Sequence, residues 1–90
     1  MASFKTQFSD VFELPEEILL DAPLIMLVGK RKIYLENHKG IALYQKDLIK
    51  VRVKSGILII KGDKLKIEEI ESENIYIQGK INELAYEARG

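Results

Sequence analysis

Apolar residues in most of this chain alternate with other residues and keep the same parity across many turns. From residue 24 onward, 16 of the 23 Ile, Leu and Val residues occupy odd-numbered positions. Successive side chains of a β-strand point to opposite faces, so residues of one parity share a face. We therefore predict one continuous buried face made of Ile25, Leu27, Ile33, Leu35, Ile41, Leu43, Ile49, Val51, Val53, Ile57, Ile59, Leu65, Ile67, Ile75, Ile77 and Ile81.

The apolar runs also recur every eight residues, which is the length of a short strand plus a tight turn. Such runs begin at Ile33, Ile41, Ile49, Ile57 and Leu65, and glycines separate several of them. This pattern predicts an all-β domain, an antiparallel meander of six to seven short strands. To cover its apolar face the meander must curl into a roll, barrel or sandwich. A β-solenoid is the alternative, since two units of eight residues approximate one coil.

The even-numbered face is mixed, because it carries both charged and large apolar residues. Lys50, Arg52 and Lys54 alternate as a basic stripe along one predicted strand. So many apolar groups on one face indicate that another layer or a partner covers part of it. The candidate interaction surface consists of Tyr34, Tyr44, Lys50, Arg52, Lys54, Leu58, Ile60 and Tyr76.

The N-terminal residues have a different pattern. Residues 1–12 are polar with three interspersed Phe and no sustained period, which predicts a flexible arm. Pro15 followed by two Glu suits the first turn of a short helix, and Pro23 prevents that helix from continuing. We therefore expect an arm over 1–12 and a single domain over 13–90 that opens with a helical turn.

Composition narrows the class of protein. The 90 residues are 47% hydrophobic and 31% charged, as in ordinary globular domains, with a formal net charge of zero and no Cys. Zero net charge argues against a nucleic-acid partner and permits self-association. The lack of Cys, of a signal peptide and of any apolar run near 20 residues predicts a cytoplasmic protein without direct membrane insertion.

No pattern typical of a catalytic or cofactor site is present. His38 lies in Asn37-His38-Lys39-Gly40, a composition suited to a hairpin turn, and one His without Cys cannot form an ordinary zinc site. The Ser and Thr residues fall in the arm or in predicted turns, and no Gly-rich phosphate loop occurs. We expect no metal, no cofactor and no enzymatic activity.

Several short segments stand out by their order and spacing. They are Glu13-Leu14-Pro15, Pro23-Leu24-Ile25 with Gly29, Glu36-Asn37-His38-Lys39-Gly40-Ile41, Val53-Lys54-Ser55-Gly56, Ile60-Lys61-Gly62 and Ile77-Gln78-Gly79-Lys80-Ile81. In this order and spacing they resemble the YabP/YqfC sporulation family, and the early Leu-Pro element brings the chain closer to the YqfC branch. The resemblance covers about residues 13–86.

The resemblance implies a protein made in the mother cell during spore formation and needed for spore development or envelope assembly. It also implies a protein partner, a membrane protein resembling YqfD, which would hold the chain beside the forespore membrane. Our expectation is a structural or assembly module that contacts partners or other copies through strand edges or the mixed face. The alternative is a small-ligand or oligonucleotide-binding β-barrel with Arg52 and tyrosines at its mouth.

Overall fold

The computed structural model describes residues 22–88, and every regular element in that range is a β-strand. This confirms the predicted all-β class. The expected arm over 1–12 and the expected helical turn lie outside the described residues. The strands are β1 (Leu24–Val28), β2 (Lys32–Glu36), β3 (Ile41–Tyr44), β4 (Leu48–Val53), β5 (Gly56–Ile70) and β6 (Asn74–Ala88).

All six strands form one antiparallel sheet in the order β1-β2-β6-β5-β4-β3. Strands β3 to β6 follow one another as a meander, whereas β2 pairs with β6 and not with β3. The order therefore departs from a simple meander at one connection, residues 37–40. Antiparallel pairing throughout this sheet excludes the solenoid alternative, in which successive coils pair in parallel.

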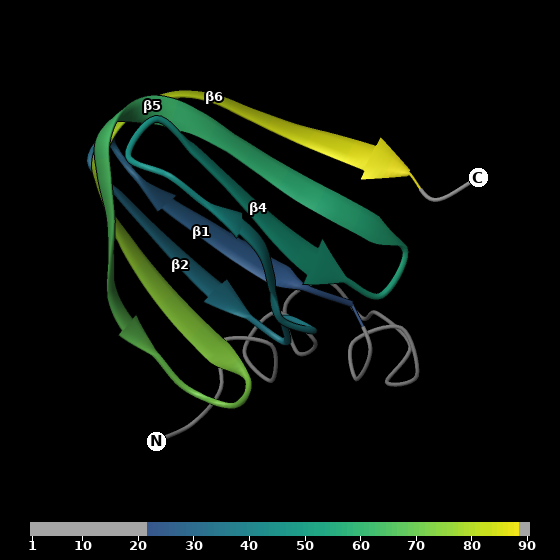
Figure 1. Cartoon of the computed structure of the whole chain (residues 1–90). Helices are drawn as coiled ribbons and strands as arrows, with labels where there is room; N and C mark the ends of the chain where they lie inside the picture. The colour runs from purple at the N-terminus through teal and green to yellow at the C-terminus, as the bar shows by residue number, and fades with distance from the viewer. Residues whose placement is uncertain (1–21, 89–90) are drawn as a thin grey trace.

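The two longest strands fold the sheet over on itself (Figure 1). β5 and β6 each span 15 residues and pair with each other along most of their length. The first half of β5 pairs with β4, and the first half of β6 pairs with β2. The expected separate strands at Ile57 and Leu65 are thus one strand, which bends where a turn was predicted.

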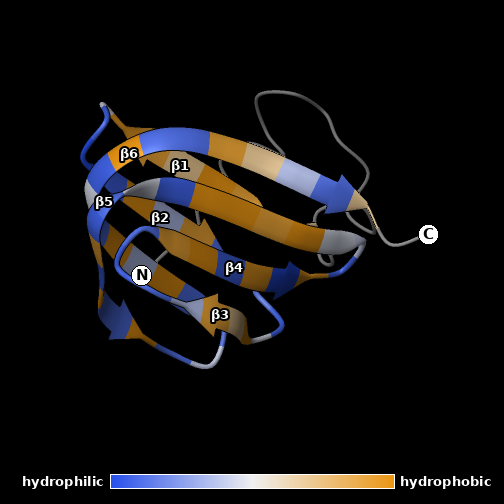
Figure 2. Cartoon of the chain, turned by 45° about the horizontal axis from the view of Figure 1, so that its top comes forward, coloured by the Kyte–Doolittle hydropathy of each residue, from blue (hydrophilic) through white to orange (hydrophobic). Residues whose placement is uncertain are grey.

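The core lies between the two halves of the bent sheet. Its fully buried side chains come from both halves, and each is at most 1% exposed. Figure 2 shows a long hydrophobic stretch in the first half of β5 and an alternation of hydrophobic and hydrophilic residues along β4, while hydrophilic residues gather at the bends. These core residues are Ile33, Leu35, Ile75 and Ile77 from one half and Ile49, Val51, Leu58 and Ile60 from the other.

Leu58 and Ile60 correct the parity prediction, which placed them on the outer face. They are 1% and 0% exposed and belong to the core. The cause is the two-residue turn Lys54–Ser55, across which Val53 pairs with Gly56. Paired residues lie on the same face, so the core-facing parity changes from odd to even at this turn.

The bend of β5 restores the original parity. The register between β5 and β6 shifts three times between Lys61 and Glu69. As a result Leu65 faces the core again and is 4% exposed. Between turn and bend, Ile57 and Ile59 lie on the outer face and are only half-buried, although we predicted them to be in the core.

Two glycines allow the strands to pass closely at the bend. A Cβ atom on Gly62 would collide with the carbonyl oxygen of Lys80. A Cβ on Gly79, whose φ is 149°, would lie 2.9 Å from the Cα of Leu65 and from the carbonyl oxygen of Lys64. Because backbone atoms block both positions, a larger residue would displace one strand from the other.

His38 joins the two halves of the sheet and does not lie in a hairpin turn as predicted, since β2 and β3 do not pair. The backbone N–H of Gly40 donates to its Nδ1 at 3.0 Å. Nε2 therefore carries the proton and donates to the carbonyl oxygen of Glu71 at 2.8 Å. The ring is 8% exposed and holds the β2–β3 connection against the β5–β6 turn.

Candidate interaction surfaces

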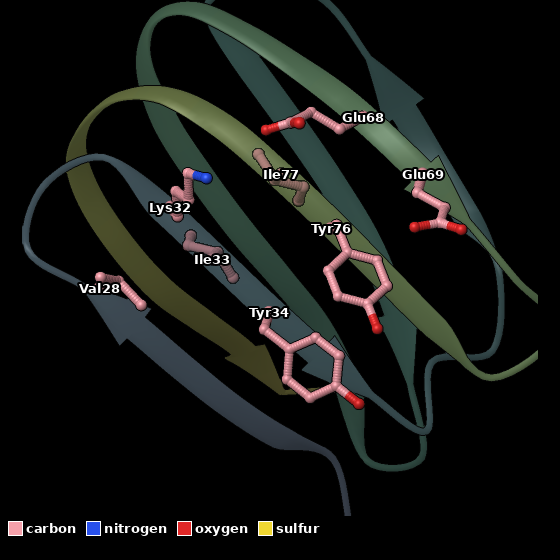
Figure 3. Close-up of a pocket in the computed structure, with 8 residues that line it drawn as sticks. All are labelled: Val28, Lys32, Ile33, Tyr34, Glu68, Glu69, Tyr76 and Ile77. Carbon is pink, nitrogen blue, oxygen red and sulfur yellow. The ribbon is translucent and has the colours of Figure 1, made fainter. Parts of the chain in front are cut away.

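The outer face of β2, β5 and β6 carries an open hollow of about 430 Å³ (Figure 3). At its centre Tyr34 pairs with Tyr76, with ring centroids 4.9 Å apart and an interplanar angle of 46°. The hydroxyl groups point the same way, and Glu68 and Glu69 approach from β5. The hollow is lined by Val28, Lys32, Ile33, Tyr34, Glu68, Glu69, Tyr76 and Ile77.

The surroundings of the tyrosine pair are acidic. Burial, followed by the charge of Glu36 and contacts with Tyr76, raises the pKa of Tyr34 to about 12. Tyr34 therefore remains a neutral phenol at physiological pH. Two aromatic rings beside carboxylates suit a cationic or apolar side chain better than an anion.

The basic stripe lies elsewhere and does not join the tyrosine pair. Lys50 and Arg52 project from the outer face of β4, which belongs to the other half of the bent sheet, and Lys54 lies in the β4–β5 turn. The Nη1 of Arg52 donates to the carbonyl oxygen of Ile41 at 2.8 Å and so ties β3 to β4. A binding mouth that combines Arg52 with the tyrosine pair is thus not formed.

The remaining predicted surface residues have structural positions. Tyr44 is 49% exposed, yet its hydroxyl accepts a hydrogen bond of 2.9 Å from the backbone N–H of Ile67 and so links β3 to β5. Leu58 and Ile60 are in the core and contribute nothing to a surface. Of the eight predicted residues, the structure brings together the tyrosine pair in one place and the basic stripe in another.

The second half of β6 forms a free strand edge, which the sequence analysis did not locate. Residues 82–88 pair with β5 on one side, and no strand of residues 22–88 pairs with their other side. Leu84 and Tyr86 project beside this edge and are 37% and 51% exposed. The segment contains no Pro and no Lys, two residues that commonly protect an edge from pairing. The lack of Pro and Lys in residues 82–88, together with the alternating pattern of this segment, is the sequence signal that could have identified the free edge.

The bend carries a cluster of cations that the sequence analysis also missed. Arg31, Lys64, Lys66 and Lys80 line a second hollow of about 380 Å³, together with Asp63. These residues come from the β1–β2 turn, β5 and β6. Their signal in the sequence is weak, because the cations come from three separate segments that the strand pattern does not bring together.

Within residues 22–88, no group of three or more potential metal ligands gathers in one place. No helix in this part of the chain is long and apolar enough to cross a bilayer.

Fold and surfaces together define a small β-roll whose distinctive features are a free strand edge, an acidic tyrosine hollow and a basic bend. Residues 21–90 match the YabP family, so the chain belongs to this sporulation-associated family. It is 33% identical over 82 residues to the uncharacterized protein YqfC of Bacillus subtilis strain 168. The aligned region covers 91% of this chain and 88% of the relative. The predicted family is thereby confirmed. No solved structure is significantly similar to the chain.

Proposed function

We propose that this chain is a non-catalytic assembly module of spore formation, acting in the mother cell through protein–protein contacts. The observation that carries the proposal is the free edge of β6 over residues 82–88. Membership in a sporulation-associated family supports the cellular process, and the edge supports the mode of action.

A free edge presents unpaired backbone N–H and C=O groups that an extended segment of another chain can satisfy. Leu84 pairs with the buried Ile60 and therefore faces the core side of the sheet. It is nevertheless 37% exposed, because no described strand follows β6 on this side. An added strand would cover Leu84 and Tyr86 with its own apolar side chains, which gives the contact a hydrophobic contribution besides the hydrogen bonds.

Charge at this edge favours a different protein over a second copy as the partner. In a symmetric antiparallel pairing centred on Ala85, Glu83 of one copy would lie opposite Glu87 of the other. Like charges directly opposite each other destabilise a strand pair. We propose that the added strand comes from a membrane protein resembling YqfD and alternates apolar with basic residues.

Site-specific photo-cross-linking tests this function. A benzoylphenylalanine replaces Tyr86 in cells that also make the YqfD-like protein of the same organism, and a matched probe at exposed Ser72 in the β5–β6 turn is the control. We expect a cross-link to that membrane protein from position 86 and none from position 72.

A cross-link between two copies from position 86 would keep the assembly role and overturn the partner. The role itself would be abandoned if neither probe captured a protein while the labelled chain stayed folded and supported spore formation. Light scattering coupled to size exclusion complements the cross-linking experiment by measuring the mass of the chain in solution. We expect a monomer, because Glu83 and Glu87 would repel each other in a symmetric pairing of two copies.

A further inference from the structure

Four separate segments meet at the bend of the roll, and backbone hydrogen bonds hold them together. The N–H of Gly79 donates to the carbonyl oxygen of Arg31 at 3.0 Å, which joins β6 to the β1–β2 turn. The N–H of Leu65 donates to the carbonyl oxygen of Lys46 at 2.6 Å, which joins β5 to the β3–β4 loop. In Figure 1 the β1–β2 turn lies beside the bends of β5 and β6 at the left of the molecule.

These segments bring cations together into what we call the basic end. Its charged side chains are all exposed, and Asp47 and Asp63 are the carboxylates among them. Six cations against two carboxylates give this end a local charge of +4, although the whole chain is neutral. The cations of the basic end are Lys30, Arg31, Lys46, Lys64, Lys66 and Lys80.

The β5–β6 turn, at one end of these two strands, is acidic, so the charge of the molecule is separated between the bend and this turn. Glu69, Glu71 and Glu73 lie at or beside the β5–β6 turn, and all three are exposed. A neutral molecule with separated charge is not drawn strongly to a polyanion as a whole, but it is oriented by a nearby negative surface. The basic end would face such a surface and the acidic turn would face away.

We propose that the basic end binds the anionic phospholipid headgroups of a bilayer surface. Its cations are placed at turns and bends at one extremity of the roll, which can approach a planar surface, and the hollow of about 380 Å³ between them is open to a headgroup phosphate. Five of the six cations are Lys, whose flexible ammonium groups act as point charges toward phosphates. This activity is separate from strand addition at β6 and does not depend on it.

Single-stranded nucleic acid fits the basic end less well than a bilayer does. Binding of such a strand combines a cationic groove with aromatic side chains on which bases stack. No aromatic residue lines the hollow at the basic end, and the tyrosine pair lies in the acidic hollow. The observations therefore favour headgroups over bases.

Membrane contact through the basic end also leaves the β6 edge accessible. From Ile81 to Ala88 the strand runs away from the bend, and Figure 1 shows its end at the far side of the molecule. The same molecule can thus lie on a bilayer and pair with another chain.

The test is sedimentation of the full chain with vesicles of phosphatidylcholine alone or with about 30 mol% phosphatidylglycerol, at low salt, where charge attraction is strongest. We expect sedimentation with the anionic vesicles only. In a first variant Lys64, Lys66 and Lys80 become Gln. At about fivefold per cation, this should weaken vesicle binding about 100-fold.

A control variant with Lys39, Lys50 and Lys54 changed to Gln has the same net charge as the first variant but keeps the basic end intact. We expect it to bind vesicles within about threefold of the parent chain, since its removed cations lie outside the basic end. Equal thermal transitions of the two variants would establish that both are folded.

Equal weakening in the two variants would overturn the proposal, because net charge and not the basic end would then control binding. Equal binding to neutral and anionic vesicles would overturn it as well. The proposal would also be overturned if the chain did not bind anionic vesicles but bound single-stranded DNA through the same three lysines.

Discussion

Truncation of Leu58 should destabilise the domain more than truncation of its neighbour Ile57. Simple alternation, which places Ile57 in the core, predicts the reverse. Leu58 is 1% exposed and packs in the core, whereas Ile57 lies half-buried on the outer face. Leu58→Ala removes three buried carbon groups at about 0.8 kcal/mol each and leaves a cavity, so we expect a loss of about 3–4 kcal/mol. Ile57→Ala should cost about 1 kcal/mol, because its side chain retains contact with water in the folded state.

Urea unfolding followed by circular dichroism measures the difference. With an m-value of about 1.5 kcal/mol/M, a loss of 3 kcal/mol moves the midpoint by about 2 M, and Ile57→Ala should move it by less than about 1 M. The chain's total stability, about 5–13 kcal/mol for its size, leaves the Leu58 variant measurable. A larger midpoint shift for Ile57→Ala than for Leu58→Ala would refute the change of parity at the β4–β5 turn.

Three further predictions follow from the bend, the connection and the hollow. Gly79→Ala should lose about 2 kcal/mol or more in the same urea assay, because its Cβ meets backbone atoms 2.9 Å away, and a loss near zero would contradict the close strand approach. His38→Ala removes two hydrogen bonds from a buried ring and should cost about 2 kcal/mol, measured by the thermal transition; a neutral result would show that the connection holds without the ring. The pKa of Tyr34 is raised to about 12 in the folded state, so the stability that it contributes is complete below pH 10 and is lost as the pH rises toward 12. Tyr34→Phe should flatten this part of the stability profile, and an identical profile would contradict the raised pKa.

Much of the core could be predicted because alternation is a local property of strands. Ile33, Leu35, Ile49 and Val51 are buried as expected, and so is Ile77. The prediction failed in β5, since a single even-length turn reverses the parity and bulges then reverse it again. Turn length and bulge position depend on how two strands pair, which the spacing of apolar residues in one strand does not specify.

The strand order is the second feature that alternation does not determine. A chain with short connections favours neighbours in sequence as neighbours in the sheet. Here β2 pairs with β6, and the connection between β2 and β3 is held by His38 and by the N–H of Asn37, which donates to the carbonyl oxygen of Glu73 at 2.7 Å. These bonds span more than 30 residues of sequence, so no local pattern predicts them.

For the candidate surfaces too, alternation along the strands predicts which residues share a face, whereas the bend of the sheet determines which of them lie close together. The Tyr34–Tyr76 contact joins residues 42 positions apart, yet both tyrosines have the same parity and were predicted to share a face. Arg52 has that parity too, but the bend of β5 and β6 turns its half of the sheet away from the tyrosine pair. The same bend creates the basic end from charges that lie in four separate segments of the sequence. Because Gly62 and Gly79 allow the bend, they control both the fold and the surface through which the molecule would meet a bilayer.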